Sequence, residues 1–268
     1  MDVRVVYSLV STLFVVMANG DSWAAPERGF YRIVDGKNAT RCQFPHQALV
    51  QSDEKTVCGG SLITQSIVLT AAGCTVGFKK LTIRLGTNQR TQKDTNTWTA
   101  VSTWSKAHPD YDFDGHSEND VALAFLPEKA PLGACIKTVP LPLKADVNKT
   151  YVGQRPLISG WGRISNSSEY PEHLRWIQVT VVPNDVCSKI YSAGVIRDST
   201  LCAASNAPGI CWGDRGGALV LKTEEGYTQI GVASYFGGDC HSEGTPAGYS
   251  RVTSYLNWIA VTGEITLP

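Results

Sequence analysis

Eight cysteines constrain the fold of this 268-residue chain more than any other feature of its sequence. They are Cys42, Cys58, Cys74, Cys135, Cys187, Cys202, Cys211 and Cys240. An even number of cysteines in an exported chain predicts disulfide bonds, four in this case. Zinc binding is the alternative, but the sequence contains no Cys-x-x-Cys or His-x-x-x-His spacing. We therefore expect neither a metal ion nor another cofactor.

The N-terminal residues 1–24 are typical of an export signal. Arg4 precedes an apolar run, residues 5–18, which is interrupted by serine and is too short to span a bilayer. Cleavage is predicted after Gly20 or after Ala24, because each has a small residue two positions earlier. No later stretch approaches the roughly 18 apolar residues of a membrane span. The chain is therefore predicted to be secreted, with no membrane anchor.

Charge and composition exclude several classes of function. The chain has 24 Lys+Arg against 24 Asp+Glu, and 43% of its residues are apolar. Without net charge or a basic run we expect no nucleic-acid partner. The apolar fraction is sufficient for a large core and excludes low-complexity disorder. Three glycosylation sequons begin at Asn38, Asn148 and Asn166, and we expect one or two of them to carry glycans.

Short apolar runs separated by turn residues predict an all-β fold. The predicted strands are residues 47–51, 61–63, 67–71, 81–85, 121–126, 157–159, 176–182 and 229–234. Only the last segment has helical spacing, with Val252, Tyr255, Leu256 and Ile259 on one face and Gly263 as its end. No fixed-period repeat or long linker interrupts the chain, which favours one compact unit of two packed barrels.

Six motifs then occur in a fixed order. They are Arg32-Ile33-Val34-Asp35-Gly36, Cys58-Gly59-Gly60-Ser61-Leu62-Ile63, Leu69-Thr70-Ala71-Ala72-Gly73-Cys74, Asn119-Asp120-Val121-Ala122-Leu123, Ser159-Gly160-Trp161-Gly162 and Gly213-Asp214-Arg215-Gly216-Gly217. With them the chain resembles the trypsin/chymotrypsin family of serine proteases, from Arg32 to the final helix. The resemblance implies two packed six-stranded antiparallel Greek-key β-barrels with a C-terminal helix and an active-site cleft between the barrels. It also implies a short activation propeptide, residues 25–32, before a protease-like domain, residues 33–268.

The catalytic positions that this resemblance implies are degenerate. The family's Asp corresponds to Asp120, but its His position holds Gly73 and its nucleophile position holds Arg215. Glycine cannot accept a proton, and a guanidinium with a pKa above about 12 is neither a base nor a nucleophile. The Arg215 side chain is expected either to pair with Asp120 or to point to solvent. None of the five histidines, His46, His108, His116, His173 and His241, lies in a motif that would place it beside Asp120, and most are expected at the surface.

The substrate pocket and the oxyanion hole are also expected to differ from those of active relatives. The resemblance places Gly209 on the pocket floor, where a carboxylate would select basic side chains. Ser234, Tyr235, Phe236 and Ala247 would line the pocket walls, and Gly213 would be the remnant of the oxyanion hole. Either Phe236 or Gly237 occupies the position at which glycine normally admits a substrate backbone, so we expect a partly filled pocket.

The activation residues of the family are retained. Cleavage after Arg32 would free the Ile33 ammonium, which in the family pairs with the residue corresponding to Asp214. The alternative is that the chain works uncut. The resemblance also implies disulfides between Cys58 and Cys74, Cys187 and Cys202, and Cys211 and Cys240. Cys42 and Cys135 hold no common family position, and parity suggests that they join each other.

We therefore expect a secreted, monomeric, non-catalytic serine protease homologue that acts by binding. Its partner would be an extracellular protein, namely a protease, an inhibitor or a cascade substrate, which it would regulate, mimic as a decoy or scaffold. One alternative is an active endopeptidase or hydrolase with displaced machinery. The other is a structural secreted glycoprotein.

Overall fold

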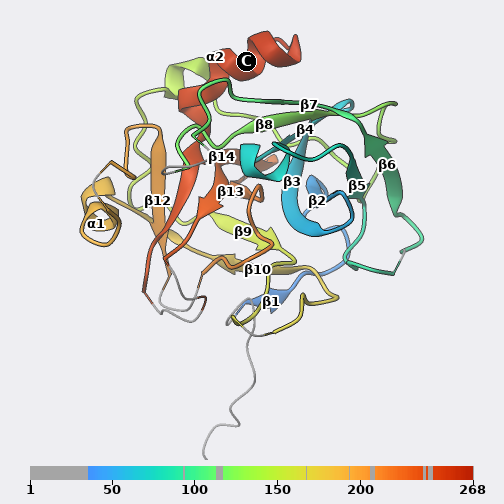
Figure 1. Cartoon of the computed structure of the whole chain (residues 1–268), viewed down its shortest axis with the longest axis horizontal. Coiled ribbons are helices and arrows are strands. Elements are labelled where there is room, and N and C mark those ends of the chain that lie inside the picture. Colours follow the sequence, from blue (N-terminus) through green and yellow to red (C-terminus); the bar gives the residue numbers. More distant parts are fainter. Residues whose placement is uncertain are drawn as a thin grey trace, which may run out of the picture. The chain divides into compact units, whose positions relative to one another are not determined.

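Two antiparallel β-sheets, each curled back on itself, form most of the structure (Figure 1). It is a computed structural model that describes residues 36–92, 94–112, 117–166, 168–192, 194–205, 209–237, 240 and 244–267. The predicted signal peptide, the predicted propeptide, Arg32 and Ile33 lie outside these residues. In the described part of the chain, no helix has the length and apolar character needed to cross a membrane.

The first sheet contains seven strands in the order β6-β5-β2-β3-β4-β8-β7. Their bounds are β2 (Gln47–Ser52), β3 (Thr56–Thr64), β4 (Ile67–Thr70), β5 (Leu81–Leu85), β6 (Trp98–Ser102), β7 (Trp104–Ala107) and β8 (Ala122–Phe125). The two edge strands, β6 and β7, are separated along the chain by Thr103 alone. One bent strand therefore pairs with both ends of the sheet, and this curls the sheet into a barrel.

The second sheet contains eight strands in the order β1-β10-β9-β13-β14-β15-β12-β11. Their bounds are β1 (Lys37–Asn38), β9 (Leu157–Gly160), β10 (Arg175–Gln178), β11 (Thr180–Val182), β12 (Thr200–Ala204), β13 (Ala218–Thr223), β14 (Gly226–Tyr235) and β15 (Ala247–Arg251). Val179 alone separates β10 from β11. Counting each bent strand once gives six strands per barrel, as predicted, with the two-residue β1 added at the edge of the second barrel.

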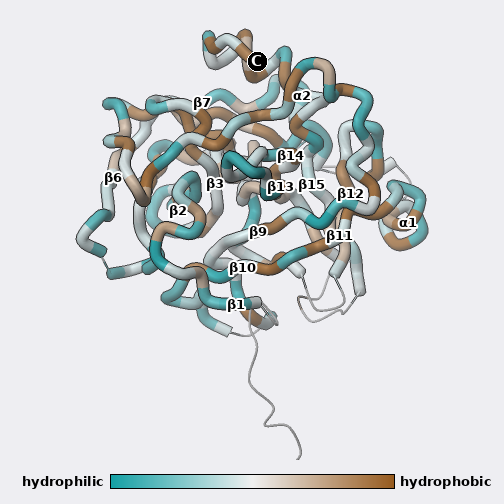
Figure 2. The backbone as a smooth tube through the Cα atoms, turned by 180° about the vertical axis from the view of Figure 1, so that it is seen from behind, coloured by the Kyte–Doolittle hydropathy of each residue, from teal (hydrophilic) through white to brown (hydrophobic). Residues whose placement is uncertain are grey.

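Alternating burial explains why these segments form strands. In β5, Leu81, Ile83 and Leu85 are buried while Thr82 and Arg84 are partly exposed, so one face packs into the core. Along the backbone, short hydrophobic stretches recur between hydrophilic ones (Figure 2). Each predicted strand is present, although β3 and β14 are longer than predicted.

Helices contribute little to the fold. Their bounds are η1 (Ala72–Cys74), η2 (Lys144–Asp146), α1 (Asn184–Ser188) and α2 (Val252–Gly263), where η marks a 3₁₀ turn. In α2 the predicted face is buried, with Val252, Tyr255, Leu256 and Ile259 each at most 4% exposed. The helix ends at Gly263 as predicted, and Glu264 follows in the left-handed region with φ of 51°.

The structure forms all four expected disulfides. Cys58–Cys74, Cys187–Cys202 and Cys211–Cys240 have Cα–Cα distances of 6.2, 6.4 and 5.2 Å. The fourth pair, Cys42–Cys135, is the one that parity suggested, and its cysteines are 93 positions apart in sequence. Closing so long a loop restricts the unfolded chain strongly, so this bridge is expected to stabilise the first barrel.

Candidate functional site

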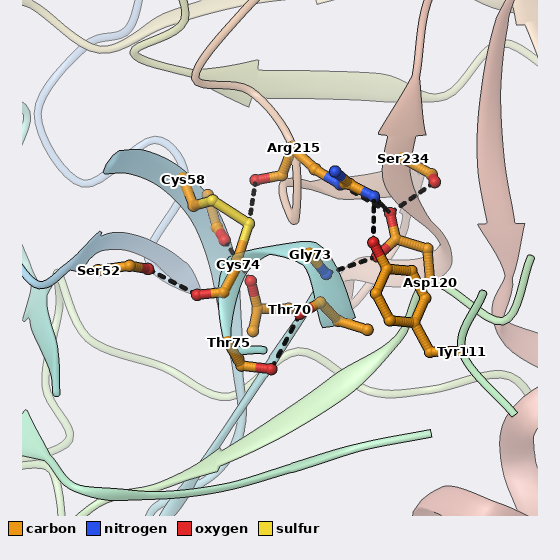
Figure 3. The surroundings of a disulfide bond; sticks show 12 residues. Ser52, Cys58, Thr70, Gly73, Cys74, Thr75, Tyr111, Asp120, Arg215 and Ser234 are labelled. Carbon is orange, nitrogen blue, oxygen red and sulfur yellow. Dashed lines mark hydrogen bonds and ion pairs between the residues drawn. A yellow bond between two sulfur atoms is a disulfide. The ribbon is translucent and has the colours of Figure 1, made fainter. Parts of the chain in front are cut away.

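Three loops bring the degenerate catalytic positions together. Gly73 lies in η1 directly after β4, Asp120 lies just before β8, and Arg215 lies in the loop before β13. The first barrel therefore supplies Gly73 and Asp120, and the second supplies Arg215. The Asp120 side chain is fully buried, whereas 32% of the Arg215 side chain is exposed. Figure 3 shows these residues beside the Cys58–Cys74 disulfide.

The guanidinium of Arg215 pairs with the carboxylate of Asp120. Nε and Nη2 of Arg215 lie 2.8 and 2.7 Å from Oδ2 of Asp120 (Figure 3). Of the two expected orientations of Arg215, the structure adopts the one directed to Asp120. Burial lowers the pKa of Arg215, but the charge of Asp120, together with Tyr111 and the hydrogen bonds to both, outweighs burial, so the pKa is raised. The guanidinium is therefore a permanent cation.

Gly73 provides the space that the guanidinium occupies. Its backbone N–H donates to Oδ1 of Asp120 at 2.9 Å. A Cβ added at Gly73 would lie only 2.5 and 2.7 Å from Nη1 and Nη2 of Arg215. Ser234 Oγ also donates to Oδ2 of Asp120, at 2.6 Å. The buried carboxylate is thus satisfied by one guanidinium, one hydroxyl and one backbone donor, and Gly73 and Arg215 fit each other sterically.

Tyr111 and Ser117 complete the arginine's surroundings, and neither was predicted from the sequence. Nη2 of Arg215 donates to the Tyr111 hydroxyl at 3.0 Å and to Ser117 Oγ at 3.3 Å. Burial, followed by the charge of Asp120, raises the pKa of Tyr111, so its phenol is neutral at physiological pH. The sequence feature that could have pointed to Tyr111 is the motif His108-Pro109-Asp110-Tyr111, which lies shortly before the Asp120 motif.

No described histidine bonds to Asp120. His108 packs against Tyr255 and Trp258 of α2, with ring centroids 5.5 and 5.2 Å away. His173 is exposed and forms an isolated bridge with Gln89. His46 is not at the surface, because it is only 2% exposed beside Phe44 and Tyr227. Burial lowers its pKa to about 4. The remaining two, His116 and His241, lie outside the described residues.

The predicted floor of the substrate pocket is narrow, whereas the predicted wall residues Ser234, Tyr235 and Phe236 line a larger cavity. Gly209, Phe236, Gly237 and Ala247 line a cavity of about 10 Å³. That space is about what one water molecule requires, roughly 10 to 15 Å³ in this measure. Both residues considered for the narrowing position, Phe236 and Gly237, contribute to this lining. The cavity has no room for a substrate side chain.

A larger cavity of about 300 Å³ lies beside Arg215. Ser234, Tyr235 and Phe236 line it on one side, and Trp212 and Gly213 are also part of its wall. Gly213 has φ of +102°, and a Cβ there would lie 2.6 Å from the Tyr170 ring, so only glycine fits. Its backbone N–H, at the oxyanion-hole position, donates to no acceptor in the described part of the chain.

Asp214 is buried behind this loop and is only 1% exposed. Its carboxylate accepts N–H bonds from Gly162 at 2.8 Å and Cys211 at 3.0 Å. Burial raises the pKa of Asp214 to about 6, although both backbone bonds act to lower it. Asp214 forms no ion pair with a described residue. Its pairing with Ile33 remains a prediction, because Ile33 lies outside the described residues.

The other predicted sites are on the surface. Asn38, Asn148 and Asn166 are all exposed, as glycosylation requires, and their modification remains a prediction.

Within the described ranges, no group of three or more His, Cys, Asp or Glu side chains is arranged to hold a metal ion.

Comparison with known proteins gives consistent matches. A family model described as Trypsin matches residues 33–259. Brachyurin of Leptuca pugilator is 35% identical over 237 residues, which are 87% of this chain and 100% of brachyurin. Venom protease of Bombus pensylvanicus is 34% identical over 205 residues, 75% of this chain and 83% of that protein. The solved structure of HL collagenase matches with a TM-score of 0.77 at 31% identity, covering 87% of this chain and 99% of the collagenase chain.

Proposed function

The chain belongs to the trypsin family of serine proteases, and we propose that it is a secreted, non-catalytic member that binds other proteins. One observation carries this proposal. The Arg215 guanidinium occupies the space beside Asp120 in which a catalytic base would have to lie, and it is bonded to Asp120 at 2.7 and 2.8 Å.

Hydrolysis in this family requires a hydroxyl nucleophile and an imidazole that takes its proton. Gly73 offers no side chain to accept a proton, and Arg215 offers no lone pair for attack. The hydroxyl of Ser234 donates directly to the carboxylate of Asp120, and no imidazole of the described residues bonds to either group. In subtilisin, loss of the serine or histidine alone reduces turnover by about 10⁶. Loss of both leaves at most the background that the oxyanion hole and binding provide.

The narrow floor of the predicted substrate pocket supports the same proposal. A protease of this family holds the residue before the scissile bond in a side-chain pocket. Here Gly209, Phe236 and Ala247 line a cavity of only about 10 Å³, and Ser234 and Tyr235 line the separate cavity beside Arg215. A substrate side chain could therefore not enter this cavity to position the peptide bond for attack. Binding of a partner through the outer cleft and loops does not require that cavity.

An extracellular protein is the partner that we propose. The four disulfides are typical of the oxidising extracellular environment, and a venom protease is among the relatives. A fold that retains the protease surface without the chemistry can engage a protease, its inhibitor or a cascade substrate as a regulator, decoy or scaffold. We propose that the protein does so as a monomer.

A digestion experiment tests the proposal against its main competitor, an active protease with displaced machinery. The mature protein, cut after Arg32, is incubated with a diverse peptide mixture and the products are identified by mass spectrometry. We expect no new termini above buffer. Peptide cleavage that co-elutes with the protein through every purification step, and that Asp120→Asn abolishes, would overturn the proposal.

A further inference from the structure

We propose that the cavity beside Arg215 binds a peptide carboxylate carried next to an apolar side chain. This inference rests on the proposed binding function, since it assigns ligand chemistry to the cleft that catalysis would otherwise use. The shared chemistry is the carboxylate, which a chain terminus or an internal acidic residue could supply.

The size and charge of the cavity fit such a group. Its volume of about 300 Å³ is at the lower end of the range for ligand sites. Among the described residues that line it, Arg215 is the only charged one. An anionic group entering the cavity therefore meets a cation and no carboxylate among the described lining residues, because Asp120 is fully buried and does not line the cavity.

Arg215 retains unused hydrogen-bond donors. A guanidinium has five N–H groups. Those on Nε and Nη2 engage Asp120, Tyr111 and Ser117, but Nη1 donates to no acceptor in the described part of the protein. Both Nη1 and Nη2 pack near Gly73, where an added Cβ would lie 2.5 and 2.7 Å away, and Arg215 itself lines the cavity. The same cavity includes Gly213, whose backbone N–H is also without a described acceptor.

The guanidinium is held in place before any ligand arrives. Hydrogen bonds to Asp120, Tyr111 and Ser117 engage its Nε and Nη2 groups, and Figure 3 shows the contacts with Asp120 and Tyr111. A preorganised donor loses little conformational entropy on binding, and charge-assisted bonds to carboxylates are about twice as strong as neutral ones. Arginine also commonly binds carboxylates with more than one N–H.

Two aromatic side chains supply the apolar part of the site. The rings of Trp212 and Phe236 contact each other edge to face, with centroids 5.1 Å apart. Trp212 is 57% exposed, which leaves much of its ring available. Exposed aromatic groups beside a fixed arginine are the side-chain types that dominate binding energy at protein interfaces.

Three peptides test the inference on the mature, full-length protein by isothermal titration calorimetry. They are acetyl-Ala-Ala-Phe with a free carboxylate, the same peptide as its amide, and amidated acetyl-Ala-Glu-Phe. We expect one or both carboxylate peptides to bind about tenfold more tightly than the neutral amide. The free-acid and glutamate peptides distinguish a chain terminus from an internal acidic residue. Equal affinities of all three, or no binding of any at millimolar concentration, would overturn the inference.

Variants locate the effect. Arg215→Met should remove the preference for carboxylate, whereas Arg155→Met, which changes an exposed arginine outside the cavity, should retain it. If Arg215→Met fails to fold, Trp212→Ala provides the test without touching the Asp120 pair. This variant should weaken binding of both the acid and the amide peptide, while the ratio of the two affinities stays near ten. Unchanged affinities would contradict the proposal that the peptides bind in this cavity.

The experiment also separates this inference from the function on which it rests. Hydrolysis of the peptides during titration would contradict the proposed non-catalytic function. Intact peptides that bind without a preference for carboxylate would contradict only the ligand assignment.

Discussion

Gly73→Ala should destabilise the protein through its effect on Arg215. The new Cβ would lie 2.5 Å from Nη1 and 2.7 Å from Nη2, which is well inside van der Waals contact. The backbone at Gly73 is not in the left-handed region, so alanine itself adds no backbone strain there. The guanidinium must therefore withdraw from the position in which it bonds to Asp120.

The expected cost follows from the pair that is disturbed. Removing one partner of a buried ion pair costs about 3 to 5 kcal/mol. One third of the Arg215 side chain is exposed and its end can shift without leaving Asp120 entirely, which reduces the cost. We expect a loss of about 2 kcal/mol in the free energy of unfolding, or a fall in Tm of about 4 to 8 °C for a domain of this size.

A double-mutant cycle with Arg215→Ala isolates this effect. In the Arg215→Ala background, Gly73→Ala should be neutral or slightly stabilising, because alanine restricts the unfolded chain. Urea unfolding followed by tryptophan fluorescence, with the disulfides intact, gives the four free energies of unfolding. The predicted coupling is about 2 kcal/mol. If Gly73→Ala costs the same in both backgrounds, the fit between Gly73 and Arg215 does not hold the site together.

Three further predictions concern other residues. Because burial lowers the pKa of His46 to about 4, the unfolded chain binds a proton below pH 6.5 before the folded protein does, and stability is lost as pH falls. From pH 7 to pH 4, the free energy of unfolding of His46→Phe should therefore rise by about 3 kcal/mol relative to that of the unmodified protein, as measured by urea unfolding. A difference between the two proteins that stays the same at both pH values would refute this. The Asn38 and Asn166 side chains accept hydrogen bonds from Arg175 and Cys240, whereas the Asn148 side chain bonds to no described residue and so has its amide free for a glycan. Asn148→Gln should therefore remove glycan mass from the protein made in a secretory host, and an unchanged mass would place the glycan elsewhere. Cutting after Arg32 should increase the affinity for a captured partner, and Asp214→Asn should weaken binding of the cut form alone. Equal affinities of the cut and uncut protein in a surface-binding assay would show that the retained activation residues are not a switch.

The strands that the sequence predicts are those with strong apolar alternation or apolar runs. Six observed strands were not predicted, namely β1, β6, β7, β12, β13 and β15. Of these, β12 (Thr200–Ala204) and β15 (Ala247–Arg251) lack a run of large apolar residues, and each is held by two neighbours, β12 by β11 and β15, and β15 by β12 and β14. The five-residue α1 is too short to show a helical period.

Motifs located the three degenerate positions, but the sequence could not choose where Arg215 points. That choice depends on residues distant along the chain. Tyr111 and Ser117, which bond its guanidinium, are 104 and 98 positions away, and the space it fills exists because Gly73 has no side chain. Only the folded arrangement of both barrels brings these groups together.

The central claim is that this member of the trypsin family lacks a working nucleophile. Its most direct test is labelling of the purified protein, cut after Arg32, with a fluorophosphonate probe, which reacts only with an activated serine. Intact-protein mass spectrometry measures the fraction labelled, with an active trypsin as the positive control. We predict that trypsin is labelled fully and this protein not at all. Stoichiometric labelling of the homogeneous protein at one serine would contradict the account.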